Sequence, residues 1–235
     1  MDMLFDLVTK SFQHFQAHMF LFWTLAIFSD LVDHRKLPDG KIVRRVMWTQ
    51  VLAVLPFSVA IVMLTYSAAP DAVSFPVTML GMLGGDFLVY FVHRLMHSHY
   101  FPNLRLLHAR HHVPLRSASQ ALDSSMFEAL SINLVLPFFP MIIMGADIVL
   151  MSRLGMIGTT VSVLTHSQWL KKIMKIPHGH DKHHQTSTTN FSNSLVPDMV
   201  FGTHWNATKE TQEKNRKRLK AMNLLASLRK DKARV

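Results

Sequence analysis

The chain has 235 residues, of which 49% are hydrophobic. Only 17% are charged, against roughly 25% in an ordinary soluble domain, so the composition favours a membrane protein of one domain. The absence of cysteine excludes Cys-ligated iron–sulfur clusters, thiolate nucleophiles and disulfides. The net charge of +10 does not indicate nucleic-acid binding, because ten of the twenty-five Lys and Arg residues lie in a tail beyond Trp205.

The amino end shows no cleavable signal peptide, since it has two acidic residues and lacks both a basic leader and a small-residue cleavage site. Spaced apolar side chains over residues 1–15 predict an amphipathic helix, either on a membrane surface or as in a soluble protein. The apolar run at 19–28 is shorter than the roughly 20 residues that a full crossing prefers. It therefore needs support from its context to be a crossing.

Two apolar segments are long enough to cross a membrane. Residues 46–66 are uncharged, and Pro56 predicts a kink there. Residues 75–92 are interrupted only by Asp86, and a charged residue at membrane depth is costly enough to indicate a role. The run at 81–85, Gly-Met-Leu-Gly-Gly, lies inside this apolar helix, so it predicts close helix packing rather than a phosphate-binding loop.

Residues 127–166 form a further apolar stretch. As one helix these forty residues would be about 60 Å long, about twice the hydrocarbon thickness of a bilayer. We therefore expect a hairpin of two short helices, with the turn marked by Gly145, Asp147 and Arg153. The predicted fold is an all-α integral membrane bundle of about three crossings plus a membrane hairpin, with a histidine-rich helical cap.

Basic residues predict the orientation in the membrane. The loop at 33–45 has five Lys or Arg residues and the tail at 205–235 has ten, whereas the loop at 67–74 has none. The positive-inside rule therefore places the first loop, the tail and the histidine-rich segments in the cytoplasm.

Histidines are concentrated in one part of the chain, with eleven of fifteen between His93 and His184. The pattern His-x-x-His-His occurs twice, and on a helix these positions share one face. A pair four residues apart stands at the end of the third apolar segment. The eight histidines placed by this spacing are His93, His97, His108, His111, His112, His180, His183 and His184.

This spacing predicts two transition-metal ions with about four histidines each, because imidazole suits iron, zinc, copper and nickel. A ferritin-like di-iron site is excluded, since it needs four Glu and the chain has three. A two-zinc hydrolase is disfavoured because carboxylates are missing at ligand spacing, apart from Asp181 inside the last box. Asp86 shares a helix face with Tyr90 and His93, which suggests that it orients a ligand.

The strings DFLVYFVHRLMH, HARHH and HDKHH, followed by NF and FGT, resemble the integral-membrane fatty acid hydroxylase and sterol desaturase superfamily. The resemblance covers about residues 75–203. It implies two Fe²⁺ ions, O₂ as co-substrate, and oxidation of an unactivated lipid carbon. The sequence departs from the family pattern at Gln168, Ser192 and Pro197.

The resemblance adds a ninth metal ligand, His166, and His178 is a further candidate. The residues expected to support the ligands are Asp86, Tyr90, Glu128, Asp181 and Asn190, with Asp198 as a weaker candidate. For Glu128 the alternative is an acid that favours the start of a helix.

The chain has no nicotinamide or flavin fingerprint, so electrons are expected from a separate cytochrome or ferredoxin-type donor. The basic tail docks that donor, binds anionic lipids, or only sets topology. The expected function is an oxygen-dependent lipid C–H oxidase with a catalytic core at about 75–204, most simply a hydroxylase of a fatty acyl, sterol or related lipid. The alternatives are a desaturase with the same centre, and a non-catalytic metal-binding transporter or sensor, which would tolerate irregular histidine spacing.

Overall fold

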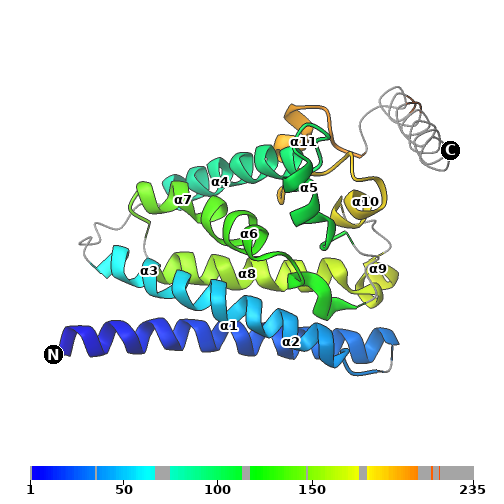
Figure 1. Cartoon of the computed structure of the whole chain (residues 1–235). Coiled ribbons are helices and arrows are strands. Elements are labelled where there is room, and N and C mark those ends of the chain that lie inside the picture. Colours follow the sequence, from blue (N-terminus) through cyan, green and yellow to red (C-terminus); the bar gives the residue numbers. More distant parts are fainter. Residues whose placement is uncertain are drawn as a thin grey trace.

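The computed structural model describes residues 2–34, 36–66, 75–112, 117–146, 148–174, 179–205, 213 and 217. These residues form helices and no strands, so the predicted all-α class is confirmed for them (Figure 1). The long helices, with two π-helical segments inserted in them, are α1 (Asp2–His34), α2 (Gly40–Thr49), η1 (Gln50–Val54), α3 (Leu55–Tyr66), α4 (Phe75–Met96), α6 (Met126–Glu128), η3 (Ala129–Val135), α7 (Leu136–Ile143) and α8 (Ile148–His166). The shorter elements are α5 (Pro102–Ala109), the 3₁₀ helix η2 (Ala118–Leu122), α9 (Gln168–Met174), α10 (Gly179–Thr186) and α11 (Val196–Val200). The loop at 67–74 and most of the basic tail lie outside the described residues.

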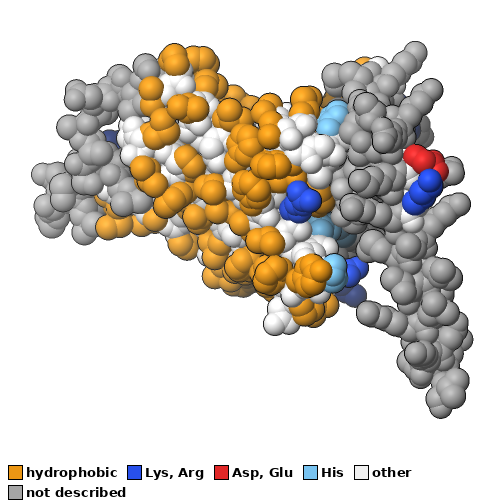
Figure 2. Space-filling view, turned by 90° about the horizontal axis from the view of Figure 1, so that it is seen from above, with side chains coloured by type: hydrophobic (Ala, Val, Ile, Leu, Met, Phe, Trp, Pro, Cys, Tyr) orange, Lys and Arg blue, Asp and Glu red, His pale blue; other side chains and the backbone are white. Residues whose placement is uncertain are grey.

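Four helical stretches are long and apolar enough to cross a membrane: Phe5–His34, Gly40–Met63, Phe75–Met96 and Met126–Ile143. The last of these is the first arm of the expected hairpin, and α8 is its second arm. Figure 2 shows hydrophobic side chains covering most of the described part of one face, with histidines toward the end where α5 and α10 lie in Figure 1. These apolar helices indicate a membrane protein.

The first helix differs from the expectation. Instead of a separate amphipathic segment at 1–15, α1 runs unbroken to His34. The reason is that residues 2–34 contain no Gly or Pro to interrupt the helical hydrogen bonds. At about 1.5 Å per residue this helix is about 50 Å long, so it extends beyond the hydrocarbon layer.

The hairpin turns where Gly145 adopts a left-handed backbone with φ 74°. This conformation is open to glycine at little cost, so one of the three predicted turn markers is in place. Arg153 is not at the turn, because it lies inside α8. Asp147 lies outside the described residues.

Helices α4 and α7 pack closely through glycine. A Cβ on Gly85 would lie 2.3 Å from the backbone oxygen of Pro137, and one on Gly81 would lie 2.9 Å from Cγ of Met141. The predicted close packing of the 81–85 run is therefore confirmed. The expected irregularity near Pro56 takes the form of the π-helical segment η1, which ends two residues before it.

The short elements gather at one end of the bundle, beside the carboxyl ends of α4 and α8 (Figure 1). Acidic side chains fix them there. Asp30 accepts a hydrogen bond from the N–H of Ala118 at the start of η2, and Asp33 accepts one from the N–H of Gln168 at the start of α9. The end of α1 thus anchors the segments that surround the histidines.

Candidate metal centre

Four segments carry the nine predicted histidine ligands. His93 lies in the last turn of α4, and His97 follows directly after that helix. His108 lies in the last turn of α5, and His166 is the last residue of α8. The last box lies on α10.

The second box does not present one helical face. Helix α5 ends at Ala109, so His111 and His112 belong to the turn that follows it. Arg110 pairs there with the buried carboxylate of Asp123, at 2.7 Å, and Arg45 of α2 pairs with the same carboxylate at 2.5 Å. This ion-pair network holds the turn, and the turn directs the rings of one box to different places.

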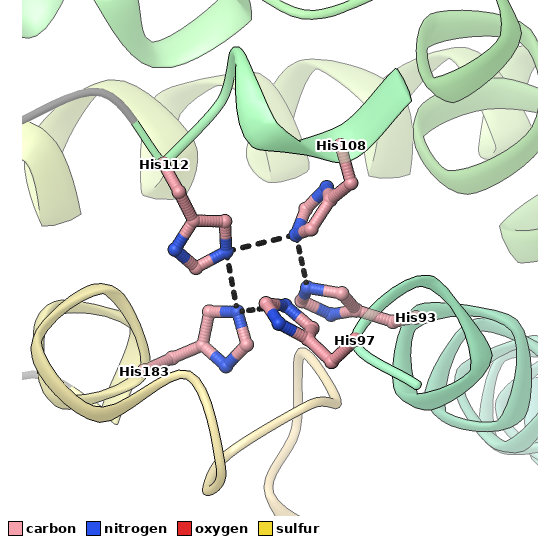
Figure 3. A group of neighbouring side chains, drawn as sticks. All are labelled: His93, His97, His108, His112 and His183. Atoms are coloured by element: carbon pink, nitrogen blue, oxygen red, sulfur yellow. Dashed lines mark hydrogen bonds between the residues drawn. The ribbon is translucent and has the colours of Figure 1, made fainter. Parts of the chain in front are cut away.

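Five histidines form the first of two groups, in which the ligand nitrogens all lie within 4.8 Å of one another. The Nε2 atoms of His112 and His108 are 2.8 Å apart, and those of His112 and His183 are 3.0 Å apart (Figure 3). The members of this first group are His93, His97, His108, His112 and His183.

Four histidines form the second group, on the same distance criterion. The Nε2 atom of His184 lies 2.9 Å from Nε2 of His180 and 3.2 Å from Nε2 of His111. The members of this second group are His111, His166, His180 and His184. The structure thus brings together all nine predicted ligands, and each His-x-x-His-His string contributes to both groups.

Backbone carbonyl groups fix the orientation of three rings. Nδ1 of His93 lies 2.7 Å from the oxygen of Phe191, Nδ1 of His183 lies 2.8 Å from that of Thr189, and Nδ1 of His166 lies 2.7 Å from that of Ser162. A carbonyl can only accept, so these nitrogens carry the proton. The Nε2 atoms of these rings therefore carry lone pairs, as metal ligands must.

The close nitrogen contacts cannot all be hydrogen bonds. If Nε2 of His112 carries a proton, that single N–H can donate to His108 or to His183, but it cannot make a near-linear hydrogen bond to both. A transition metal holds imidazole nitrogens at about 2.1 Å, which places neighbouring ligand nitrogens about 3 Å apart. Neighbouring Nε2 atoms of eight of the nine rings lie 2.8 to 3.4 Å apart, which matches that requirement, and His166 lies within the 4.8 Å limit of its group. The donor set therefore fits two metal ions.

Burial keeps the rings outside the membrane-spanning segments neutral. It lowers the pKa of His108 to about 4, and together with the neighbouring histidines it lowers the pKa of His112 to about 3. The pKa values of His111, His180 and His183 are also well below the usual value, with burial as the largest cause. At neutral pH these lone pairs are available for metal.

One carboxylate contacts both groups. Oε1 of Glu128 lies 3.1 Å from Nδ1 of His108 and 3.7 Å from Nδ1 of His111. Ser125 caps the short helix α6 by accepting the N–H of Glu128, so the acidic side chain is not needed for that cap.

The other expected supporting residues hold the loop that follows α10. Asp86 accepts hydrogen bonds from the N–H of Asn193 at 2.7 Å and from the N–H and hydroxyl of Ser194, rather than from an imidazole. Asn190 donates to the oxygen of Gly179 and accepts from the N–H of Trp205. Asp86 therefore holds the loop, and Asn190 joins it to the start of α10, each one step away from the grouped histidines.

Tyr90 is fully buried and lies at the join between α4 and the same loop. Its hydroxyl accepts a hydrogen bond from Arg94 and lies 3.2 Å from the hydroxyl oxygen of Thr203, and its ring stacks on Phe201 with centroids 5.0 Å apart. His178 and the side chain of Asp181 lie outside the described residues.

Asp198 is more important to the site than its weak sequence support suggested. It is fully buried and accepts hydrogen bonds from the N–H groups of Phe191 and Ser192 and from the hydroxyl of Thr203.

Asp123, which orders the turn after α5, was not predicted from the sequence. Its only local signal is an acidic residue in a polar stretch, and its partners are 13 and 78 residues away.

Comparison with known families identifies the same region. The fatty acid hydroxylase family model matches residues 78–203, which is more than half of the chain and includes all nine histidines. Searches of curated proteins and of solved structures found no match.

Proposed function

The chain belongs to the fatty acid hydroxylase family, and on that premise we propose that it is an oxygen-dependent lipid C–H oxidase, most simply a hydroxylase. Its substrate is a fatty acyl, sterol or related lipid, and its nine histidines hold two Fe²⁺ ions. The observation that carries this proposal is the pair of buried imidazole groups, whose Nε2 lone pairs face one another at distances that a metal ion requires.

The metal pair, when bound, would supply the capacity to activate O₂ and to break an unactivated C–H bond. The chain supplies the rest. The carbonyl groups of Phe191, Thr189 and Ser162 hold three rings by their Nδ1–H groups and so aim Nε2 inward. Four of the nine rings, those of His93, His108, His166 and His183, are buried, which limits the access of water that would cause side reactions.

The reaction needs two electrons from outside the metal pair. Hydroxylation converts R–H, O₂, two electrons and two protons to R–OH and water. Desaturation converts a –CH₂–CH₂– unit, with the same O₂, electrons and protons, to –CH=CH– and two waters. The chain has no cysteine, so it cannot hold an iron–sulfur cluster through Cys, and we propose a separate cytochrome or ferredoxin-type donor.

We also propose that the histidine groups and the basic tail are cytoplasmic. The end of the bundle that carries the histidines also carries the loop between α1 and α2, which is rich in Lys and Arg (Figure 1). Basic loops of this length favour the cytoplasm. A lipid chain in the adjoining bilayer and a cytoplasmic electron donor would then both reach the same end of the bundle.

The test joins metal analysis to lipid analysis. Purified protein is expected to bind two metal ions per chain, and cells that express it are expected to accumulate a lipid with one added oxygen. A lipid that has instead lost two hydrogens would establish a desaturase. His111→Ala should abolish the new product, whereas His99→Ala, which changes an exposed histidine outside both groups, should not. Fewer than two metals per chain, or a lipid profile that His111→Ala leaves unchanged, would refute the proposal.

A further inference from the structure

Glu128 contacts one histidine from each group. Its Oε1 lies 3.1 Å from Nδ1 of His108, which belongs to the first group, and 3.7 Å from Nδ1 of His111, which belongs to the second. The rings of His108 and His111 are stacked with centroids 5.5 Å apart. The carboxylate therefore meets both rings on the side opposite to their Nε2 atoms.

Glu128 is buried against the histidines, and its side chain is not needed to cap its helix. Glu128 is only 2% exposed, and the cap of its helix is supplied by Ser125. The nearby acid Asp123 is paired with Arg45 and Arg110. Oε2 of Glu128 and the Nδ1 atoms of His108 and His111 have no hydrogen-bond partner among the described residues, so the carboxylate meets the two imidazoles at ion-pair distances, with these buried nitrogens turned toward it.

A carboxylate behind a metal-ligating imidazole fixes the ring and makes its Nε2 a stronger donor. Three other rings receive only a neutral carbonyl at this position. The nine imidazoles also bring no negative charge toward two divalent ions. A single carboxylate that serves one ring of each group would therefore strengthen both sites at once.

We propose that Glu128 is a positioning residue shared by the two histidine groups, which raises the metal affinity of both. This inference rests on the proposed two-metal function. One side chain would then act on the metal affinity of both groups.

The test is a titration of the purified, metal-free full chain in detergent with Co²⁺, followed by its visible absorption. Wild type is expected to bind two ions. Glu128→Gln keeps an acceptor oxygen but removes the charge, and we expect it to weaken both binding steps by about 10- to 100-fold. Glu128→Ala removes the acceptor as well and should weaken both steps further. Glu213→Gln makes the same change at an exposed glutamate and should bind Co²⁺ as wild type does.

A structural role alone would give a different result. In that case Glu128→Gln would lower the melting temperature of the metal-free protein and leave the affinity of the folded fraction for Co²⁺ unchanged. That result, or weakening of only one of the two steps in both Glu128 variants, overturns the inference. Should wild type itself bind fewer than two Co²⁺ ions, the two-metal function fails instead. The shorter Glu128→Asp retains the charge, and it should recover part of the affinity that Glu128→Ala loses.

Discussion

Asp198 accepts a hydrogen bond from the N–H of Phe191 at 2.9 Å, and the carbonyl of that same Phe191 holds the ring of His93. A buried acid thus acts on one of the grouped histidines through a single residue. The same carboxylate also accepts the N–H of Ser192, so it fixes the loop directly after α10.

We expect Asp198→Ala to lower the free energy of unfolding by about 3 kcal/mol or more, since each buried donor left without an acceptor costs about 1–3 kcal/mol. Metal affinity should fall as well, because Phe191 then loses its fixed position. Chemical denaturation in detergent measures the first effect and metal titration the second. Asp6→Ala is the control, since its ion pair with Lys10 is exposed and contributes at most about 1 kcal/mol. Equal effects of the two variants would contradict the role of Asp198.

The two groups should respond differently to loss of one ligand. His166→Ala leaves three histidines in the second group, whereas His97→Ala leaves four in the first. Four imidazoles complete a tetrahedral shell and three do not. Metal analysis after dialysis should therefore find about one equivalent in His166→Ala and nearly two in His97→Ala. The reverse order would show that the five-histidine group is the weaker one.

Helix packing gives a prediction that is independent of metal. Gly85→Ala forces a Cβ against the backbone oxygen of Pro137, which cannot move without shifting α7. We expect loss of folded protein, or a melting temperature lower by about 10 °C, on the scale of about 2–4 °C per kcal/mol for a chain of this length. Gly158→Ala is the matched control, because a Cβ there meets nothing within 4 Å. It should melt at or above the wild-type temperature, since Ala favours a helix by up to about 1 kcal/mol over Gly.

The metal-free protein should lose stability in acid. Burial lowers the pKa of His108 from 6.5 to about 4 in the folded state, so below pH 6.5 the unfolded chain binds a proton that the folded chain does not. The free energy of unfolding is therefore constant above about pH 6.5 and falls between pH 6.5 and 4. His108 alone contributes on the order of 3 kcal/mol to that fall. Denaturation curves at pH 8, 6 and 5 measure it.

His108→Gln provides the comparison for that experiment. It removes one of the depressed groups, so its stability should fall less steeply over the same pH range. A steeper fall, or a wild type that is most stable at pH 5, would contradict the assignment of neutral buried rings.

The cysteine-free chain allows a direct test of sidedness. Single cysteines at Lys41 and Lys182 should react with an impermeant maleimide only when it reaches the cytoplasmic face. A cysteine at Ser74, in the loop that has no Lys or Arg, should react from the opposite face. Labelling of Lys41→Cys and Ser74→Cys from the same side would overturn the proposed orientation.

The sequence was informative where the physical signal is local. Apolar length predicted the helices, and the glycine run at 81–85 predicted the contact with α7. Histidine spacing selected eight of the nine grouped histidines, and the family resemblance added His166. The division of those ligands into two groups was not predictable, because it depends on the end of α5 at Ala109. No Gly or Pro marks that end.

Long-range contacts account for the remaining differences. Asp86 shares a face with His93, which suggested a direct contact, but its partners are 107 and 108 residues away in the loop after α10. Asp123 likewise acts through Arg45, from another helix. The charge of Arg153 suggests a turn, yet a single charge does not stop a helix, and α8 continues through it.

The division of each His-x-x-His-His string between two groups has a consequence for the history and the engineering of this fold. In the first string His108 and His112 belong to the first group and His111 to the second. In the second string His183 belongs to the first group, and His180 and His184 to the second. Neither string alone specifies a whole centre, so duplicating or transplanting one of them yields two fragments. During evolution a copied string would likewise supply two ligands to one group and one to the other, and would complete neither. A designer who moves this chemistry to another scaffold must transfer both strings and their relative register as one unit.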